Sequence, residues 1–162
     1  MPARRRIEAT AGVHAVRQWA DSLGAPVAGR ARGVWDAQAT RGDDATQTAP
    51  APSTASGAAL PATAGLDRRT LATAVRFTLE ELTACAPGHA VEVRVPPHGV
   101  TQAVSGTVHR RGTPPSVVET DAATWLALAT GRLSWSEALS SGDLHASGER
   151  CDLSPYLPLV RA

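Results

Sequence analysis

The chain has 162 residues, which is enough for one domain with an extension and too few for two ordinary domains. Its formal net charge of +1 and its pI near 7.9 argue against a nucleic-acid-binding protein, which usually carries a concentrated basic surface. No apolar run approaches the ~20 residues of a membrane-spanning helix. No apolar core follows the basic residues 4–6, so the sequence predicts no secretory signal and we expect a cytoplasmic protein.

The first segment, residues 7–24, has a helical pattern that ends at Gly24, a residue type favoured just after a helix. The apolar positions of one face are Val13, Val16, Trp19 (or Ala20) and Leu23.

Residues 25–64 lose this periodicity and consist mainly of Ala, Thr, Ser, Pro and Gly. Such a composition buries too little apolar surface to offset the entropy of ordering the chain. The sequence therefore predicts an N-terminal helix in residues 1–24, a flexible, disordered linker at 25–64 and a domain at 65–162.

The domain is expected to begin with a helix at residues 68–85, because Asp67 can accept hydrogen bonds from the first turn and Pro87-Gly88 follows its end. Phe77 lies off the apolar stripe of this helix, which predicts a second packed surface. The stripe itself consists of Leu71, Ala74, Val75, Thr78, Leu79 and Leu82.

Three strands are predicted next. Val91, Val93 and Val95 alternate with charged residues, as in a half-buried strand. Val100 and Val104 have the same parity as Val108, which predicts that they form the buried face of a second, antiparallel strand within residues 100–109. A short third strand is expected from Ser116 to Thr120.

Two helices and a strand are expected to follow. Asp121 can cap a helix that stops at Gly131, and Ser134 with Glu137 matches a capping box for a short helix at 135–140. A strand near 143–149 and a single helical turn after Ser154 complete the chain. The order α-β-β-β-α-α-β-α predicts an α+β fold with one antiparallel-rich sheet covered by helices.

This order and several sequence blocks resemble the sterol-carrier-protein (SCP2-like) family, over residues 67–160 and the first helix. The blocks are Val117 to Asp121, Thr124 to Leu133, Glu137-Ala138, Ser141 to Leu144, Ser147-Gly148 and Leu153 to Leu159. The segments Glu92 to Pro97 and Arg111 to Pro115 further resemble a group of proteins from high-GC Gram-positive bacteria described as bacterial sterol-carrier orthologues. The resemblance implies an SCP2-like fold and a carrier or binding role.

In that fold, a tunnel for an apolar ligand lies between the sheet and the helices that follow the third strand, and the C-terminal segment closes it. The resemblance therefore implies a ligand site made by Trp125, Leu126, Leu128, Ala129, Leu133, Trp135, Leu139, Leu153, Leu157 and Leu159. The same side chains are also what a small solid core needs, so the sequence leaves both interpretations open.

A second candidate is the loop before the third strand, where arginine forks suit a carboxylate or phosphate. The residues that could contact the anionic head group of a ligand are His109, Arg110, Arg111 and Thr113. The alternative is structural: Arg111 could form a salt bridge with Glu119 or Glu92.

The sequence predicts no cofactor, metal site or catalytic constellation. The histidines have no metal-ligand spacing, and there is no nucleophile elbow, phosphate-binding loop or dinucleotide fingerprint. Cys85 and Cys151 are expected to be reduced, with a disulfide as the alternative. The resulting hypothesis is a non-enzymatic carrier of an acyl chain or sterol-like lipid. The alternative is a solid-core accessory module that binds a partner protein beside an enzyme.

Overall fold

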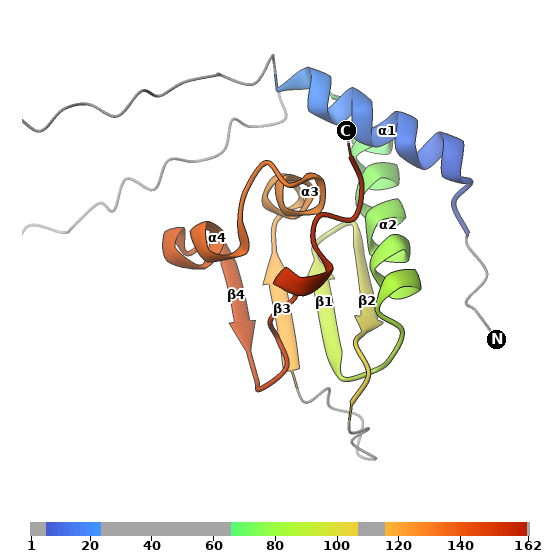
Figure 1. The fold of residues 1–162 in the computed structure, drawn as a ribbon. Coiled ribbons are helices and arrows are strands. Elements are labelled where there is room, and N and C mark those ends of the chain that lie inside the picture. The colour runs from blue at the N-terminus through green and yellow to red at the C-terminus, as the bar shows by residue number, and fades with distance from the viewer. Residues whose placement is uncertain (1–5, 24–65, 107–115, 162) are drawn as a thin grey trace, which may run out of the picture.

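The computed structural model describes residues 6–23, 66–106 and 116–161, and its helices and strands follow the predicted order (Figure 1). The elements are α1 (Ala9–Ser22), α2 (Arg68–Cys85), β1 (Val91–Val95), β2 (Gly99–Ala103), β3 (Ser116–Thr120), α3 (Ala122–Thr130), α4 (Trp135–Ser141), β4 (Leu144–Ser147) and the 3-10 turn η1 (Ser154–Tyr156). None of the helices in these ranges is long and apolar enough to cross a membrane. The predicted linker, residues 25–64, lies wholly outside the described residues.

The strands form one sheet in the order β2-β1-β3-β4. β1 pairs antiparallel with β2 and parallel with β3, and β3 pairs antiparallel with β4. The parallel pair sits at the centre because the chain leaves β2 by a long connection before it returns as β3. The prediction of an α+β fold with one antiparallel-rich sheet is confirmed.

The two faces of the sheet differ in chemistry. Val91, Val93 and Val95 are fully buried on the face toward α2. On the opposite face Arg94 pairs with Glu92 at 2.6 Å and approaches Glu119 of β3 at 3.8 Å. The covered face therefore holds the core, and these charged side chains mark the face that points away from it.

Helix α2 packs against the buried face of β1 and β2, and its sequence explains its bounds. The Asp67 carboxylate accepts from the backbone N–H groups of Arg69 and Thr70 at 2.9 and 3.1 Å, which satisfies donors that the first turn leaves free. At the other end the hydroxyl groups of Thr83 and Thr101 lie 2.8 Å apart and join α2 to β2. The predicted range 68–85 is confirmed.

The second strand differs from its prediction. β2 ends at Ala103, which is fully buried, whereas Val100 is 62% exposed on the other face. Val104 has a φ of +66° and leaves the strand geometry. Its N–H donates to the Ala86 carbonyl and its carbonyl accepts from Ala90 N–H, so it joins the loop before β1. Since neighbouring strand residues face opposite ways, a face assigned from Val100 and Val104 is shifted by one residue. Val108 lies outside the described residues.

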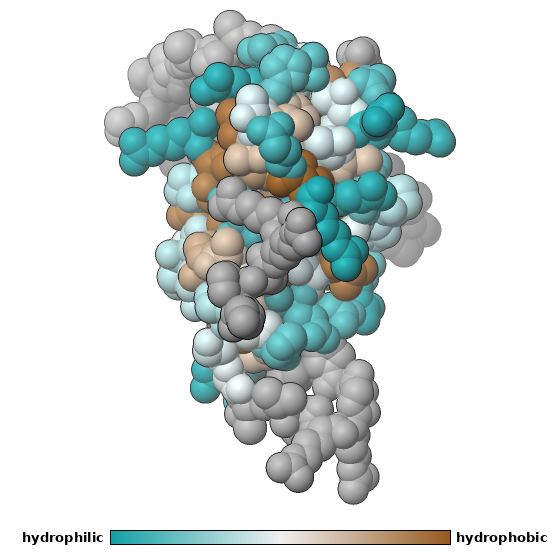
Figure 2. Space-filling model, turned by 90° about the vertical axis from the view of Figure 1, so that its right-hand side faces the viewer, coloured by the Kyte–Doolittle hydropathy of each residue, from teal (hydrophilic) through white to brown (hydrophobic). Residues whose placement is uncertain are grey.

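Helix α1 packs on α2 through the second surface that Phe77 predicted. A Cβ atom on Gly12 would lie 2.2 Å from the Phe77 ring, so only glycine allows this close approach. Val16 and Trp19 of α1 are buried in the same core. Figure 2 views the molecule from the right-hand side of Figure 1. In the upper part of this view, hydrophobic residues lie among hydrophilic ones.

Candidate ligand-binding site

Helix α3 supplies the inner part of the predicted ligand site. The Asp121 carboxylate accepts from Ala123 N–H and Thr124 N–H, which starts the helix at the predicted residue. Trp125 and Leu126 are fully buried, and the Trp125 indole N–H donates to Thr78 Oγ1 of α2 at 2.8 Å. This bond satisfies the polar end of a side chain that would otherwise bring an unpaired donor into the core. Leu128 and Ala129 are buried beside them.

Helix α4 divides its predicted ligand residues between two environments. The Ser134 hydroxyl accepts from Glu137 N–H, and the Glu137 carboxylate accepts from Ser134 N–H, so the predicted capping box is confirmed. Trp135 is 9% exposed and belongs to the core, and Leu133 is packed against it. Leu139 is 43% exposed and lies outside the core.

The C-terminal segment, residues 151–161, crosses the sheet and rises past α3 (Figure 1). Leu153 is fully buried, whereas the apolar side chains after it are only partly buried. The backbone N–H groups of Leu159 and Val160 both donate to the carbonyl of Ala129, at 2.9 and 3.1 Å. The structure therefore brings the end of α3 and the C-terminal segment together. The partly buried apolar residues of this segment are Cys151, Tyr156, Leu157, Leu159 and Val160.

Two hollows of the described surface are open to solvent and lie elsewhere. One, of about 560 Å³, lies beside β4 and includes Leu139 and Leu144 with His145 and Glu119. The other, of about 410 Å³, follows the outer side of α1 around Val13 and His14. Leu139 is the predicted ligand residue that lines the first of them.

Residues 67–159, more than half of the chain, match the model of a family described as bacterial SCP orthologues. The chain belongs to this family. No curated protein matches the chain. Helix α1 lies outside the matched range, which begins at residue 67, although the resemblance had included it.

The family assignment agrees with the general type of protein that the sequence predicted, a domain of the lipid-carrier kind, which is generally non-catalytic. The SCP domain contains the α3 helix and most of the C-terminal segment. Membership of the family does not by itself name a ligand, because one fold can serve different functions.

The predicted head-group residues His109, Arg110, Arg111 and Thr113 lie outside the described residues. Their structural alternative invoked Glu92 and Glu119 as ion-pair partners of Arg111. Both carboxylates lie within 4 Å of the Arg94 guanidinium. Arg94 therefore already supplies a partner to these two acids.

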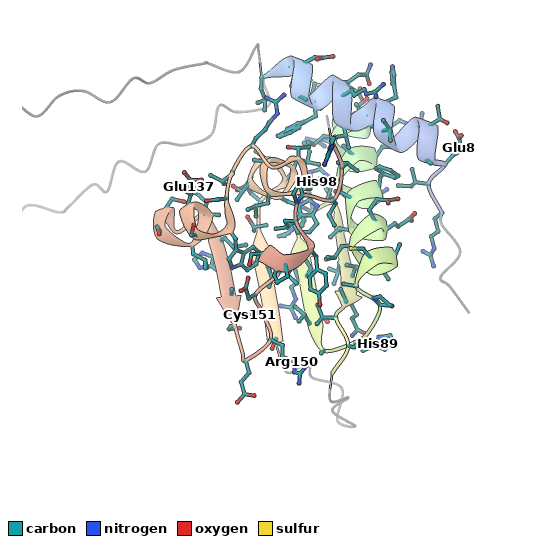
Figure 3. The ribbon with its side chains drawn as sticks, in the orientation of Figure 1. Glu8, His89, His98, Glu137, Arg150 and Cys151 are labelled. Carbon is teal, nitrogen blue, oxygen red and sulfur yellow. The ribbon has the colours of Figure 1, made fainter. Side chains whose placement is uncertain are left out.

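Burial is the main cause of a shifted pKa for two titratable side chains among the described residues of the SCP domain. Burial, with the nearby charges of Arg76 and Arg68, lowers the pKa of His98. Burial raises the pKa of the Cys85 thiol, which favours its protonated, less nucleophilic form. Both cysteines are free thiols. Within the described ranges, no group of three or more His, Cys, Asp or Glu residues could hold a metal ion. Figure 3 shows Glu8, His98 and Glu137 in different parts of the fold.

One polar feature of the interior was not predicted. Trp19 of α1 is 1% exposed, and its Nε1 atom is buried without a hydrogen-bond partner among the described residues. The guanidinium carbon of Arg132, in the connection between α3 and α4, lies 5.9 Å from the Trp19 ring centroid. The helical pattern places Trp19 on the buried face, but no sequence signal indicates that Arg132 is its neighbour.

Proposed function

We propose that the SCP domain of this chain is a non-catalytic carrier of an apolar small molecule, an acyl chain or a sterol-like lipid, taken up between α3 and the C-terminal segment. The observation that carries the proposal is the partly buried C-terminal segment lying on α3 in a domain of the SCP family. The free thiols agree with a reducing compartment, and we propose the cytoplasm.

Uptake requires the C-terminal segment to move, which breaks its contacts with α3. These contacts are two backbone hydrogen bonds to the Ala129 carbonyl and the packing of partly buried apolar side chains. Each hydrogen bond contributes about 1 kcal/mol net, because water replaces the partner when the bond opens. An acyl chain gains about 0.8 kcal/mol for every methylene that it buries. A chain of about ten carbons can therefore compensate for the displaced contacts of the segment.

The proposed lining has an inner and an outer group. The inner group, from α3, is the apolar wall against which the ligand lies, and the outer group, from the C-terminal segment, covers it. The lining residues are Trp125, Leu126, Leu128, Ala129, Leu133, Trp135 and Leu153 inside and Leu157, Leu159 and Leu139 toward the surface.

The test is a titration of the protein with a fluorescent polyene fatty acid. Wild-type protein should show saturable binding, and Leu157→Gln and Leu159→Gln should each weaken it at least tenfold, because a polar amide would contact the apolar chain. Val100→Gln is the matched control, since Val100 is 62% exposed on the opposite face of the sheet. It should leave the affinity unchanged. Absence of saturable binding to the wild type would exclude the carrier function.

A second function, a solid-core accessory module, is favoured by the way Trp125 is packed. Its side chain is fully buried with its N–H already bonded to Thr78, as expected for a core that needs no ligand. In this case no lipid-like probe binds, and purified protein forms a stable complex with a partner protein. The same titration therefore separates the two functions.

A further inference from the structure

The unpartnered indole N–H of Trp19 lies where three parts of the chain meet. Trp19 comes from α1, whereas Arg132 follows the end of α3 and donates its backbone N–H to the Ala127 carbonyl at 2.8 Å. The C-terminal segment reaches the same end of α3, since a Cβ on Gly131 would lie 3.4 Å from Pro158. The pair Trp19 and Arg132 therefore adjoins the proposed ligand site.

A buried donor without a partner is costly, at roughly 1–3 kcal/mol, and proteins usually satisfy such groups. Here none of the described residues supplies an acceptor for this donor. The guanidinium beside it adds a positive charge, and no carboxylate of the described residues pairs with Arg132. A neutral donor next to an unbalanced cation is suited to a carboxylate, which accepts from both.

We propose that Trp19 and Arg132 bind the carboxylate head group of an acyl ligand whose apolar chain lies between α3 and the C-terminal segment. This inference rests on the proposed carrier function and adds that the preferred ligand is a fatty acid rather than an uncharged lipid. It also gives α1, which lies outside the family match, a role in ligand selection.

The site differs from the loop at residues 109–113 that the sequence singled out for an anionic head group. That loop leads into β3, whereas Arg132 follows α3, which begins after the opposite end of β3. Substitutions at the two places can therefore separate them.

The experiment compares decanoate with 1-decanol by isothermal titration calorimetry at pH 8, using the full chain. The two ligands share the apolar chain and differ in the charge of the head group. Wild-type protein should bind decanoate at least tenfold more tightly than decanol, as expected for a charge-assisted hydrogen bond. Trp19→Phe and Arg132→Gln should each bring the two affinities within about threefold, mainly by weakening the binding of decanoate.

Arg150→Gln is the control for net charge, because Arg150 lies at the other end of the molecule (Figure 3). It should keep the full preference for decanoate. If Trp19→Phe fails to fold, Arg132→Gln alone decides, because Arg132 is exposed. Binding of both ligands with an unchanged preference in the variants would overturn the head-group site and leave the carrier function intact. If neither ligand binds the wild type, the carrier function itself is wrong.

Discussion

Trp125 and Thr78 show how a single residue pair joins two helices of the core. The Trp125 indole donates to the Thr78 hydroxyl at 2.8 Å, and that hydroxyl lies within hydrogen-bond distance of the Ala74 and Val75 carbonyls of its own helix. Both side chains are fully buried. The bond therefore lies where water cannot replace it, and loss of the Thr78 hydroxyl would leave the Trp125 indole N–H buried without a partner.

The first prediction concerns this pair. Thr78→Val keeps the shape but leaves the Trp125 N–H unpaired, which should lower the free energy of unfolding by roughly 1–3 kcal/mol. In a Trp125→Phe background the donor is absent, so the same Thr78→Val change should be close to neutral. Urea unfolding of the four proteins of this double-mutant cycle measures the difference. Equal effects of Thr78→Val in both backgrounds would show that the bond contributes nothing to stability.

At the scale of elements, helix α4 depends on its capping box because it has only 7 residues. So short a helix is not stable in isolation, and its first turn leaves backbone donors that Ser134 and Glu137 satisfy. The hydrogen bonds from Ser134 lower the pKa of the Glu137 carboxyl below its usual value. The folded state thus favours the ionised form.

The second prediction follows from the sign of this shift. Since the pKa of Glu137 is lower in the folded than in the unfolded chain, its contribution is complete above the unfolded value of about 4.5 and is lost as the pH falls through the lower, folded value. Glu137→Gln preserves the box without a titrating group, so its thermal stability should fall less than that of the wild type between pH 6 and pH 3. Parallel curves for the two proteins would contradict this assignment.

The same capping box predicts the effect of its serine. At pH 7, Ser134→Ala should lower the free energy of unfolding by about 1 kcal/mol, because it removes the cap itself.

At the scale of the whole molecule, α1 is attached to the SCP domain through contacts far apart in the sequence. The backbone N–H groups of Arg6 and Ile7 donate to the Glu80 carboxylate at 3.1 and 3.2 Å, which fixes the start of α1 against α2. The close approach of Gly12 to Phe77 fixes its middle, and Trp19 with Arg132 lies at its end. These contacts make α1 part of the folded core.

The third prediction tests the packing of α1 by comparing a substitution at a buried glycine with one at the exposed alanine beside it. Gly12→Ala should lower the free energy of unfolding by roughly 1–3 kcal/mol, because the new methyl group would overlap the Phe77 ring. Ala11 is the neighbouring exposed position. There the opposite change, Ala11→Gly, should also destabilise, by about 1 kcal/mol, through helix propensity alone. A Gly12→Ala protein more stable than the wild type would mean that α1 does not pack closely on Phe77 in solution.

Much of this fold could be predicted because its signals are local. The caps at Asp67, Asp121 and Ser134 and the helix stop at Gly131 depend on side chains within a few residues of the backbone groups that they satisfy. The alternation of Val91, Val93 and Val95 likewise reports one half-buried strand. The prediction for β2 was wrong about its face because it rested on the shared parity of Val100, Val104 and Val108, and the positive φ of Val104 has no sequence signal.

The candidate site was predicted only in part, because only some of the contacts that form it have local signals in the sequence. The apolar residues of α3 and of the C-terminal segment could be named from their pattern and from the family resemblance, and the structure joins these two parts at the Ala129 carbonyl. Leu139 has the same apolar character, yet it lies on the outer side of α4. Hydropathy indicates that a side chain is suited to burial, but it does not say which surface buries it.

The sequence by itself determined the helices with their caps and the order of the elements, because local hydrogen bonds and hydrophobic periodicity fix these properties. Its sequence blocks also indicated a sterol-carrier type of domain through their resemblance to that family. Only the tertiary structure decided that β1 and β3 lie parallel at the centre of the sheet and that Phe77 receives α1. It alone placed the indole of Trp19 beside Arg132. These contacts join residues far apart in the chain, and they follow from how the elements pack together rather than from any pattern within one of them.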